Sequence, residues 1–296
     1  MPRRAPRVNV FNSELISDIL LQQFISLPMG DSLSAAIVQE QDDTEYVTMS
    51  QSTTRASSAP RASASGLTRV YLLAYNAISF CLWATCVIRG ATLVFSLAPN
   101  GHLPAIFHHV YSPLLTTTQT LAGLEILHSL VGIVRAPVMT TAMQVASRLL
   151  LVWGVMYLFH DRGNGHGGIV GGDFHEALPY GPGAKVGDYA FLGCLGAWGV
   201  TECIRYGFFA LQVWGSGVPS WWTWLRYNTF YVLYPIGISS ECIMVWKALK
   251  PAAEWNPLYW WFLVVVLIIY VPGSYILYTH MIAQRRKVMK KKGRAD

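Results

Sequence analysis

The chain has 296 residues, of which 53% are hydrophobic and only 13% are charged, and its formal net charge is +6. Because soluble domains average about 25% charged residues, this composition is that of a membrane protein and argues against a soluble domain. Positive charge is concentrated in the last segment, RRKVMKKKGRAD, directly after an apolar stretch. This placement indicates contact with anionic lipid headgroups on the cytosolic side and makes nucleic acid a poor alternative.

Residues 1–67 form an N-terminal extension that we expect to be mostly disordered, with a candidate short amphipathic helix in VNVFNSELISDILLQQFISL. No short apolar core and small-residue cleavage site follow the opening MPRRAPRV, and Glu14 and Asp18 are unusual in a transit peptide. A regulatory or spacer role therefore fits the extension better than a targeting role.

Six apolar stretches follow, each of which can cross about 30 Å of hydrocarbon as a helix of about 20 residues. Pro113 and the threonine run 116–118 blur the start of the second. The expected spans are 70–90, 115–134, 138–159, 188–214, 224–248 and 258–280. We therefore predict an all-α, polytopic six-helix membrane bundle at 68–285, followed by a basic cytosolic tail at 286–296, with both termini on the cytosolic side.

Two other patterns indicate no separate chemistry. All five cysteines lie within expected spans, so we expect neither a disulfide framework nor a zinc site. The Gly-rich segment 161–188 follows a predicted membrane helix, whereas a phosphate-binding loop needs a strand before it. We interpret this segment as a flexible loop.

Polar side chains inside the spans need an explanation, because a charge at the bilayer centre costs at least about 2.5 to 3.5 kcal/mol. At about 1.5 Å per residue, four residues from four spans fall about 14 to 15 Å below the cytosolic boundary. These are Glu125, Arg148, Arg205 and Tyr234. Gln144 precedes Arg148 by four residues and should point into the same space. Pairing of Glu125 with Arg148 or Arg205 would also hold the helices together, but convergence at one depth favours a buried site.

The stretch YPIGISSE contains a phenol and a carboxylate at helical spacing. Tyr234 and Glu241 are seven residues apart, about 700° around a helix, so they share one face and lie about 10 Å apart along the axis. Gly237 leaves a notch between them, and Pro235 loosens the backbone. A phenol and a carboxylate can act as acid and base, which suggests proton removal and loss of a hydroxyl, hence dehydration. Glu241, however, lies about 10 Å deeper than the other polar groups.

At this point a family resemblance becomes specific. The segments LEILHSLVGIVRAPVMTTAMQVASRLLLVWG, ECIRYGFFAL and LRYNTFYVLYPIGISSE resemble the membrane 3-hydroxyacyl-CoA dehydratases of very-long-chain fatty acid elongation, a family also called protein tyrosine phosphatase-like. The resemblance covers about residues 68–285. It implies a multi-pass endoplasmic reticulum protein with cytosolic termini, and it implies that Tyr234 and Glu241 are catalytic.

The resemblance also implies a reaction. Glu241 would remove the C2 proton of a (3R)-3-hydroxyacyl-CoA and Tyr234 would protonate the departing 3-hydroxyl, giving the trans-2-enoyl-CoA and water. From the sequence alone the two roles remain interchangeable. The expected partners are the acyl-CoA substrate, the lipid bilayer and the other enzymes of the elongation cycle, namely ketoacyl-CoA synthase, ketoacyl-CoA reductase and enoyl-CoA reductase. No cofactor is expected.

Supporting roles follow for the remaining polar residues. Arg148 and Arg205 are candidates for holding the thioester carbonyl or activating the phenol, with Glu125 and Gln144 orienting them. Arg226, nearer the cytosolic mouth, is placed to meet CoA phosphates.

Rival functions make different demands on the sequence. Phosphatase chemistry needs a cysteine followed six positions later by an arginine, and none of the five cysteines has one. The histidines are scattered over different depths, so we expect no metal site; Glu125 and His128 form a single E-x-x-H where a di-iron bundle needs two. A transporter should show inverted repeats, which we do not find. A catalytically idle scaffold remains an alternative.

Overall fold

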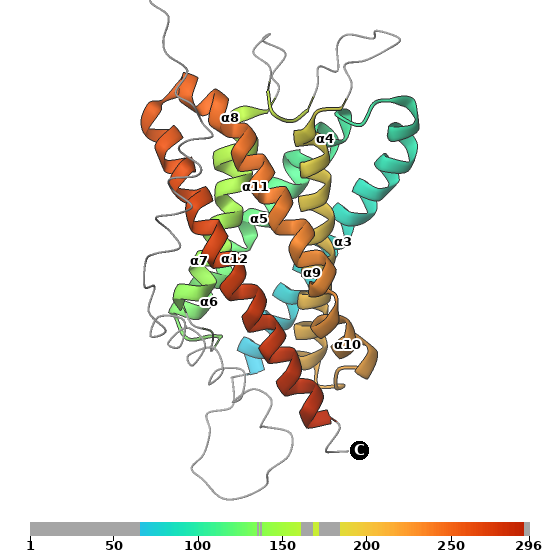
Figure 1. The fold of residues 1–296 in the computed structure, drawn as a ribbon. Coiled ribbons are helices and arrows are strands. Elements are labelled where there is room, and N and C mark those ends of the chain that lie inside the picture. Colours follow the sequence, from blue (N-terminus) through green and yellow to red (C-terminus); the bar gives the residue numbers. More distant parts are fainter. Residues whose placement is uncertain (1–65, 135, 137, 161–167, 172–183, 293–296) are drawn as a thin grey trace, which may run out of the picture.

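The computed structural model describes residues 66–134, 136, 138–160, 168–171 and 184–292. Nearly all of the N-terminal extension, most of the Gly-rich loop and the last four residues of the basic tail lie outside this part of the chain. Within it the protein folds into helices without any strand, which confirms the all-α prediction (Figure 1).

Each of the six stretches expected to span the membrane is largely helical. The helices are α3 (Gly66–Leu97), α4 (Ala105–Val110), α5 (Thr116–Leu121), α6 (Gly123–Leu130), α7 (Val138–Leu149), α8 (Tyr157–Phe159), α9 (Val186–Trp214), α10 (Ser220–Asn228), α11 (Phe230–Trp255) and α12 (Pro257–Lys292). Three shorter helical segments extend or connect them: η2 (Ala98–Asn100), η3 (Tyr111–Leu115) and η4 (Leu150–Met156). The last helix is longer than expected, since it continues through most of the basic tail.

In the part of the chain that the structure describes, four helical segments are long and apolar enough to cross a membrane, which makes the chain a multi-pass membrane protein. They are Gly66–Asn100, Thr141–Phe159, Phe230–Trp255 and Pro257–Arg286. The 29-residue helix α9 is also long enough, but it carries three charged residues, Asp188, Glu202 and Arg205. Those charges need partners if α9 lies in lipid, and the partners of two of them define the site described below.

The second expected span consists of the two short helices α5 and α6, and the chain breaks just before it, at Ser112. Ser112 has φ −116° and ψ 130°, outside the helical region, and it directly precedes Pro113. A proline ring disfavours the helical conformation of the residue before it, so the break falls where the sequence pattern was already unclear. The polar residue Glu125 lies beyond the break, on α6.

Helix α9 is the centre of the bundle, because it packs against both α3 and α11, and α11 in turn packs against α12 (Figure 1). The start of α3 and the end of α12 lie at the same end of the bundle (Figure 1). There, Arg69 of α3 donates hydrogen bonds of 2.8 Å to the carbonyl oxygens of Val213 and Trp214, the last residues of α9. The central position of α9 lets its side chains reach groups on several other helices.

Candidate active site

Four charged side chains from three helices form one connected network. Arg205 of α9 holds Glu125 of α6 with two hydrogen bonds, of 2.9 Å from Nη1 to Oε2 and 2.7 Å from Nη2 to Oε1. The same guanidinium donates from Nε to Glu202 Oε2 over 2.7 Å. Arg148 of α7 donates to the other oxygen of Glu202. The structure thus brings together Glu125, Arg148 and Arg205, three of the residues predicted to share one depth.

Glu202 is a member of this network that was not predicted from the sequence. It is buried, with 2% of its surface exposed, and it bridges the two arginines. The network therefore contains two positive and two negative groups, so each charge is compensated inside an apolar bundle. A signal was present in the sequence, since Glu202 lies in the fourth span and precedes Arg205 by three residues, the spacing of neighbours on a helix.

Glu241 of α11 lies apart from this network and has its own partners. It is buried, and each carboxylate oxygen accepts one hydrogen bond: Oε1 from Trp198 Nε1 of α9 over 2.7 Å, and Oε2 from the Tyr270 hydroxyl of α12 over 3.0 Å. Sequence analysis named neither donor. Helical spacing places Trp198 on the same face as Glu202, four residues later, but the contacts of Trp198 and Tyr270 with Glu241 depend on how α9 and α12 pack against α11.

Trp198 also connects Glu241 to the charged network. The guanidinium carbon of Arg148 lies 5.6 Å from the centre of the Trp198 ring, within the range of a cation–π contact. A continuous chain of contacts therefore runs from Glu202 through Arg148 and Trp198 to Glu241. These contacts explain how Glu241 can lie deeper than the arginines and still be connected to them. The large Trp198 ring lies between Arg148 and the Glu241 carboxylate.

Tyr234 is half-buried and packs against α12. Its hydroxyl donates to the carbonyl oxygen of Ser274 over 3.1 Å, and its ring stacks on Tyr278 with the two centres 5.7 Å apart. Ser274 follows Tyr270 by four residues, one turn and about 6 Å along α12. The α12 partners of Tyr234 and Glu241 therefore lie on consecutive turns of that helix.

The remaining predicted residues lie elsewhere. Gly237 is buried beside α9, where a methyl group would lie 3.5 Å from Ala197 Cβ, an ordinary contact distance, and the expected notch stays a prediction. Gln144 is exposed on α7, one turn before Arg148, and its expected direction stays a prediction. Arg226 of α10 packs its guanidinium over Phe208 and Phe209, 4.5 and 4.9 Å from the ring centres.

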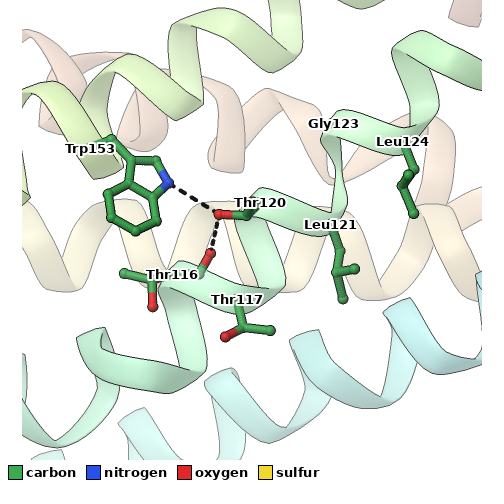
Figure 2. Close-up of a pocket in the computed structure, with 7 residues that line it drawn as sticks. All are labelled: Thr116, Thr117, Thr120, Leu121, Gly123, Leu124 and Trp153. Carbon is green, nitrogen blue, oxygen red and sulfur yellow. Dashed lines mark hydrogen bonds between the residues drawn. The ribbon is translucent and has the colours of Figure 1, made fainter.

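A groove of about 500 Å³ lies in a different place, between α5, α6 and η4 (Figure 2). Its lining residues are Thr116, Thr117, Thr120, Leu121, Gly123, Leu124 and Trp153. Thr120 Oγ1 accepts a hydrogen bond of 3.1 Å from Trp153 Nε1 and donates one of 2.6 Å to the Thr116 carbonyl (Figure 2). None of the predicted site residues lines this groove.

The two residues of the E-x-x-H pair, Glu125 and His128, have partners other than each other. In the structure Glu125 binds Arg205, while His128 Nε2 lies 2.7 Å from the Tyr71 hydroxyl. Among the described residues, no three or more His, Cys, Asp or Glu side chains gather where they could hold a metal ion. The groups that converge at this site are a carboxylate, phenols, an indole and paired guanidinium ions, which suit proton transfer.

The family described as "Protein tyrosine phosphatase-like protein, PTPLA" matches residues 119–291, more than half of the chain. The chain belongs to this family. The matched region of this PTPLA protein contains every predicted site residue, as well as Trp198, Glu202 and Tyr270. Despite the family's name, none of the five cysteines is followed six positions later by the arginine that phosphatase chemistry needs.

Several relatives carry a more specific description. A Schizosaccharomyces pombe protein, named as a probable very-long-chain (3R)-3-hydroxyacyl-CoA dehydratase, is 39% identical over 225 residues, which cover 75% of this PTPLA protein and 93% of the relative. A Caenorhabditis elegans dehydratase of the same description is 34% identical, with 75% and 95% covered. A human one, dehydratase 2, is 30% identical, with 75% and 82% covered. No solved structure matches the chain significantly.

Proposed function

We propose that this protein is a very-long-chain (3R)-3-hydroxyacyl-CoA dehydratase, which removes water to give a trans-2-enoyl-CoA in the fatty acid elongation cycle. The observation that carries the proposal is the arrangement of Tyr234 and Glu241 against consecutive turns of α12, with Glu241 buried and hydrogen-bonded at both oxygens. The dehydratase names of the relatives, and the share of their length that this chain covers, support the same activity.

Hydrogen-bond directions favour one assignment of roles. The Trp198 N–H can only donate, so Glu241 Oε1 is an acceptor, as a base must be. The Ser274 carbonyl can only accept, so the Tyr234 hydroxyl carries its proton, as an acid must. We therefore propose Glu241 as the base and Tyr234 as the acid.

The proposed step balances as a simple elimination. The Glu241 carboxylate takes the C2 proton, and the C2–H electron pair becomes the second bond of the C2=C3 double bond. The C3–O bond breaks, and the departing oxygen takes the Tyr234 proton and leaves as water. Glu241 is then protonated and Tyr234 is a phenolate, so one proton returning from Glu241 to Tyr234 restores the enzyme.

Arg148 is the better placed of the two arginines to meet the thioester carbonyl, because it contacts Trp198, which in turn binds Glu241. A cation there would stabilise the negative charge that develops on the thioester oxygen as C2 loses its proton. Arg205 is held on two sides by Glu125 and Glu202, so we assign it to positioning Arg148 through Glu202. The exposed Gln144 receives no role.

The wider setting is also proposed. Six spans, with both termini in the cytosol, would place Arg226 and the basic end of α12 at the cytosolic mouth, where CoA and anionic headgroups are found. An endoplasmic reticulum location and association with the other elongation enzymes would follow from the activity. Protease protection of tags at the two ends, in sealed microsomes, tests the topology: both tags should be digested without detergent.

Assay of the purified protein with a 3-hydroxyacyl-CoA tests the activity. Tyr234→Phe and Glu241→Gln should each lower kcat by about 10²- to 10⁴-fold, because each removes a group that transfers a proton. Tyr275→Phe and Glu254→Gln are matched controls, since both residues are exposed, and both variants should keep wild-type turnover. An idle scaffold would show no turnover even in the wild type, and folded Tyr234→Phe and Glu241→Gln variants with full activity would refute the acid and base pair.

A further inference from the structure

Glu241 is held by two neutral donors from two different helices. Trp198 of α9 reaches one oxygen over 2.7 Å and Tyr270 of α12 reaches the other over 3.0 Å. An ionised carboxylate has about four acceptor positions, so two donors fix the plane of the group and leave positions free for a proton from substrate. Such a carboxylate cannot rotate without breaking both hydrogen bonds.

The identity of the donors matters for a base. A carboxylate in an apolar bundle needs hydrogen bonds to remain charged, and a direct ion pair would satisfy it at the expense of proton removal. Here the nearby guanidinium of Arg148 binds Glu202 instead, and its carbon lies 5.6 Å from the centre of the Trp198 ring. Neutral donors therefore orient Glu241, while the positive charge stays one side chain away.

Tyr270, which binds the proposed base, lies on the same helix as the partner of the proposed acid. Its helix, α12, also provides the Ser274 carbonyl that accepts the Tyr234 hydroxyl proton, one turn after Tyr270. Both reactive groups of α11 are thus set by consecutive turns of the neighbouring helix. Loss of the Tyr270 hydrogen bond would let the Glu241 carboxylate move relative to Tyr234, which α12 holds through the Ser274 carbonyl.

We propose that Tyr270 is a positioning residue for dehydration, which together with Trp198 holds the Glu241 carboxylate in the orientation that receives the substrate's C2 proton. This inference rests on the proposed function, since it assigns Glu241 as the base. Tyr270 itself need not touch the substrate. Its contribution is to the chemical step more than to binding.

The matched control is Tyr259, on the same helix. Its hydroxyl also donates one hydrogen bond to another segment, to the Gly154 carbonyl over 2.8 Å, but it lies three turns or more from Tyr270. Phenylalanine at either position removes one hydroxyl and one hydrogen bond between helices. A structural role of the hydroxyl would affect the two variants alike, whereas a positioning role affects only one.

The experiment measures kcat and KM with a 3-hydroxyacyl-CoA for Tyr270→Phe, Tyr259→Phe and Trp198→Phe. Tyr270→Phe and Trp198→Phe should each lower kcat at least about tenfold with KM changed less than about twofold, while Tyr259→Phe should keep both constants within about twofold. In a Glu241→Asp background, whose shorter side chain cannot reach both donors, Tyr270→Phe should cause less than about a threefold further loss.

The possible results distinguish the positioning role of Tyr270 from the proposed function. Tyr270→Phe with kcat within twofold of wild type, in a protein where Glu241→Gln is inactive, overturns the positioning role and leaves the proposed function standing. Equal losses in Tyr270→Phe and Tyr259→Phe, or fully additive losses with Glu241→Asp, also overturn it. A fully active Glu241→Gln variant would instead refute the proposed function. Should Tyr270→Phe fail to fold, Trp198→Phe, which removes the other donor, decides by the same criteria.

Discussion

Gly193 of α9 and Ser240 of α11 lie so close that a methyl group on Gly193 would stand 2.2 Å from the Ser240 hydroxyl oxygen. Ser240 is the residue directly before Glu241. The contact therefore sets how near α9, with Trp198, comes to the carboxylate that it binds. Small residues at helix contacts are the usual means by which membrane helices approach one another closely.

Gly193→Ala should consequently push the two helices apart. We expect a loss of about 1 to 3 kcal/mol in the free energy of unfolding, which is the usual cost of overpacking, together with lower dehydratase activity. Thermal unfolding in detergent measures the first effect. Gly196→Ala is the control, because nothing lies within 4 Å of that position, and it should be neutral or slightly stabilising. Ser240→Gly should partly rescue Gly193→Ala; a rescue that fails would show that the contact is not the cause.

Glu202→Gln removes the negative charge between Arg148 and Arg205 while keeping the shape of the side chain. Breaking a buried ion pair by neutralising one partner costs about 3 to 5 kcal/mol, so the unfolding temperature should fall by about 6 to 20 °C. Glu254→Gln, at an exposed position of α11, should leave it unchanged. Equal unfolding temperatures for the two variants would mean that the bridge contributes nothing to stability.

Arg205→Lys keeps the positive charge but loses the planar fork that binds Glu125 through two nitrogens and Glu202 through a third. Because an ammonium cannot reproduce this geometry, we expect the free energy of unfolding to fall by about 1.5 to 3 kcal/mol. Denaturant or thermal unfolding checks the value, with the exposed Arg89→Lys of α3 as the control. Wild-type stability in Arg205→Lys would show that charge alone is sufficient.

Arg226→Ala tests the proposed contact with CoA. If the guanidinium binds a phosphate of the substrate, KM for a 3-hydroxyacyl-CoA should rise about tenfold, whereas KM for the matching acyl-pantetheine, which lacks the nucleotide, should change little. The guanidinium also packs on Phe208 and Phe209, so Arg226→Met, which retains part of this packing, controls for lost contact. An equal change for both substrates would assign Arg226 to packing.

Much of the architecture was readable because local rules govern it. Apolar stretches of about 20 residues predicted the helices, and the fixed rise of a helix placed Glu125, Arg148 and Arg205 at a common depth, where the structure joins them. The break at Ser112 has a local cause in the proline after it, although the sequence marked this region only as an unclear start of a span. The exposure of Gln144 could not be predicted in this way, because helical spacing says that two side chains are neighbours but not how far each lies from the rest of the bundle.

The partners of Glu241 could not be read in this way. Residue types and spacing predicted that Tyr234 and Glu241 could act as an acid and a base, since a phenol and a carboxylate seven residues apart share a helix face. Whether the carboxylate meets Trp198 and Tyr270, or an arginine, depends on how α9 and α12 rotate and slide against α11. Those are packing choices among helices far apart in the chain, made by contacts such as Gly193 against Ser240, and only the folded bundle reveals them.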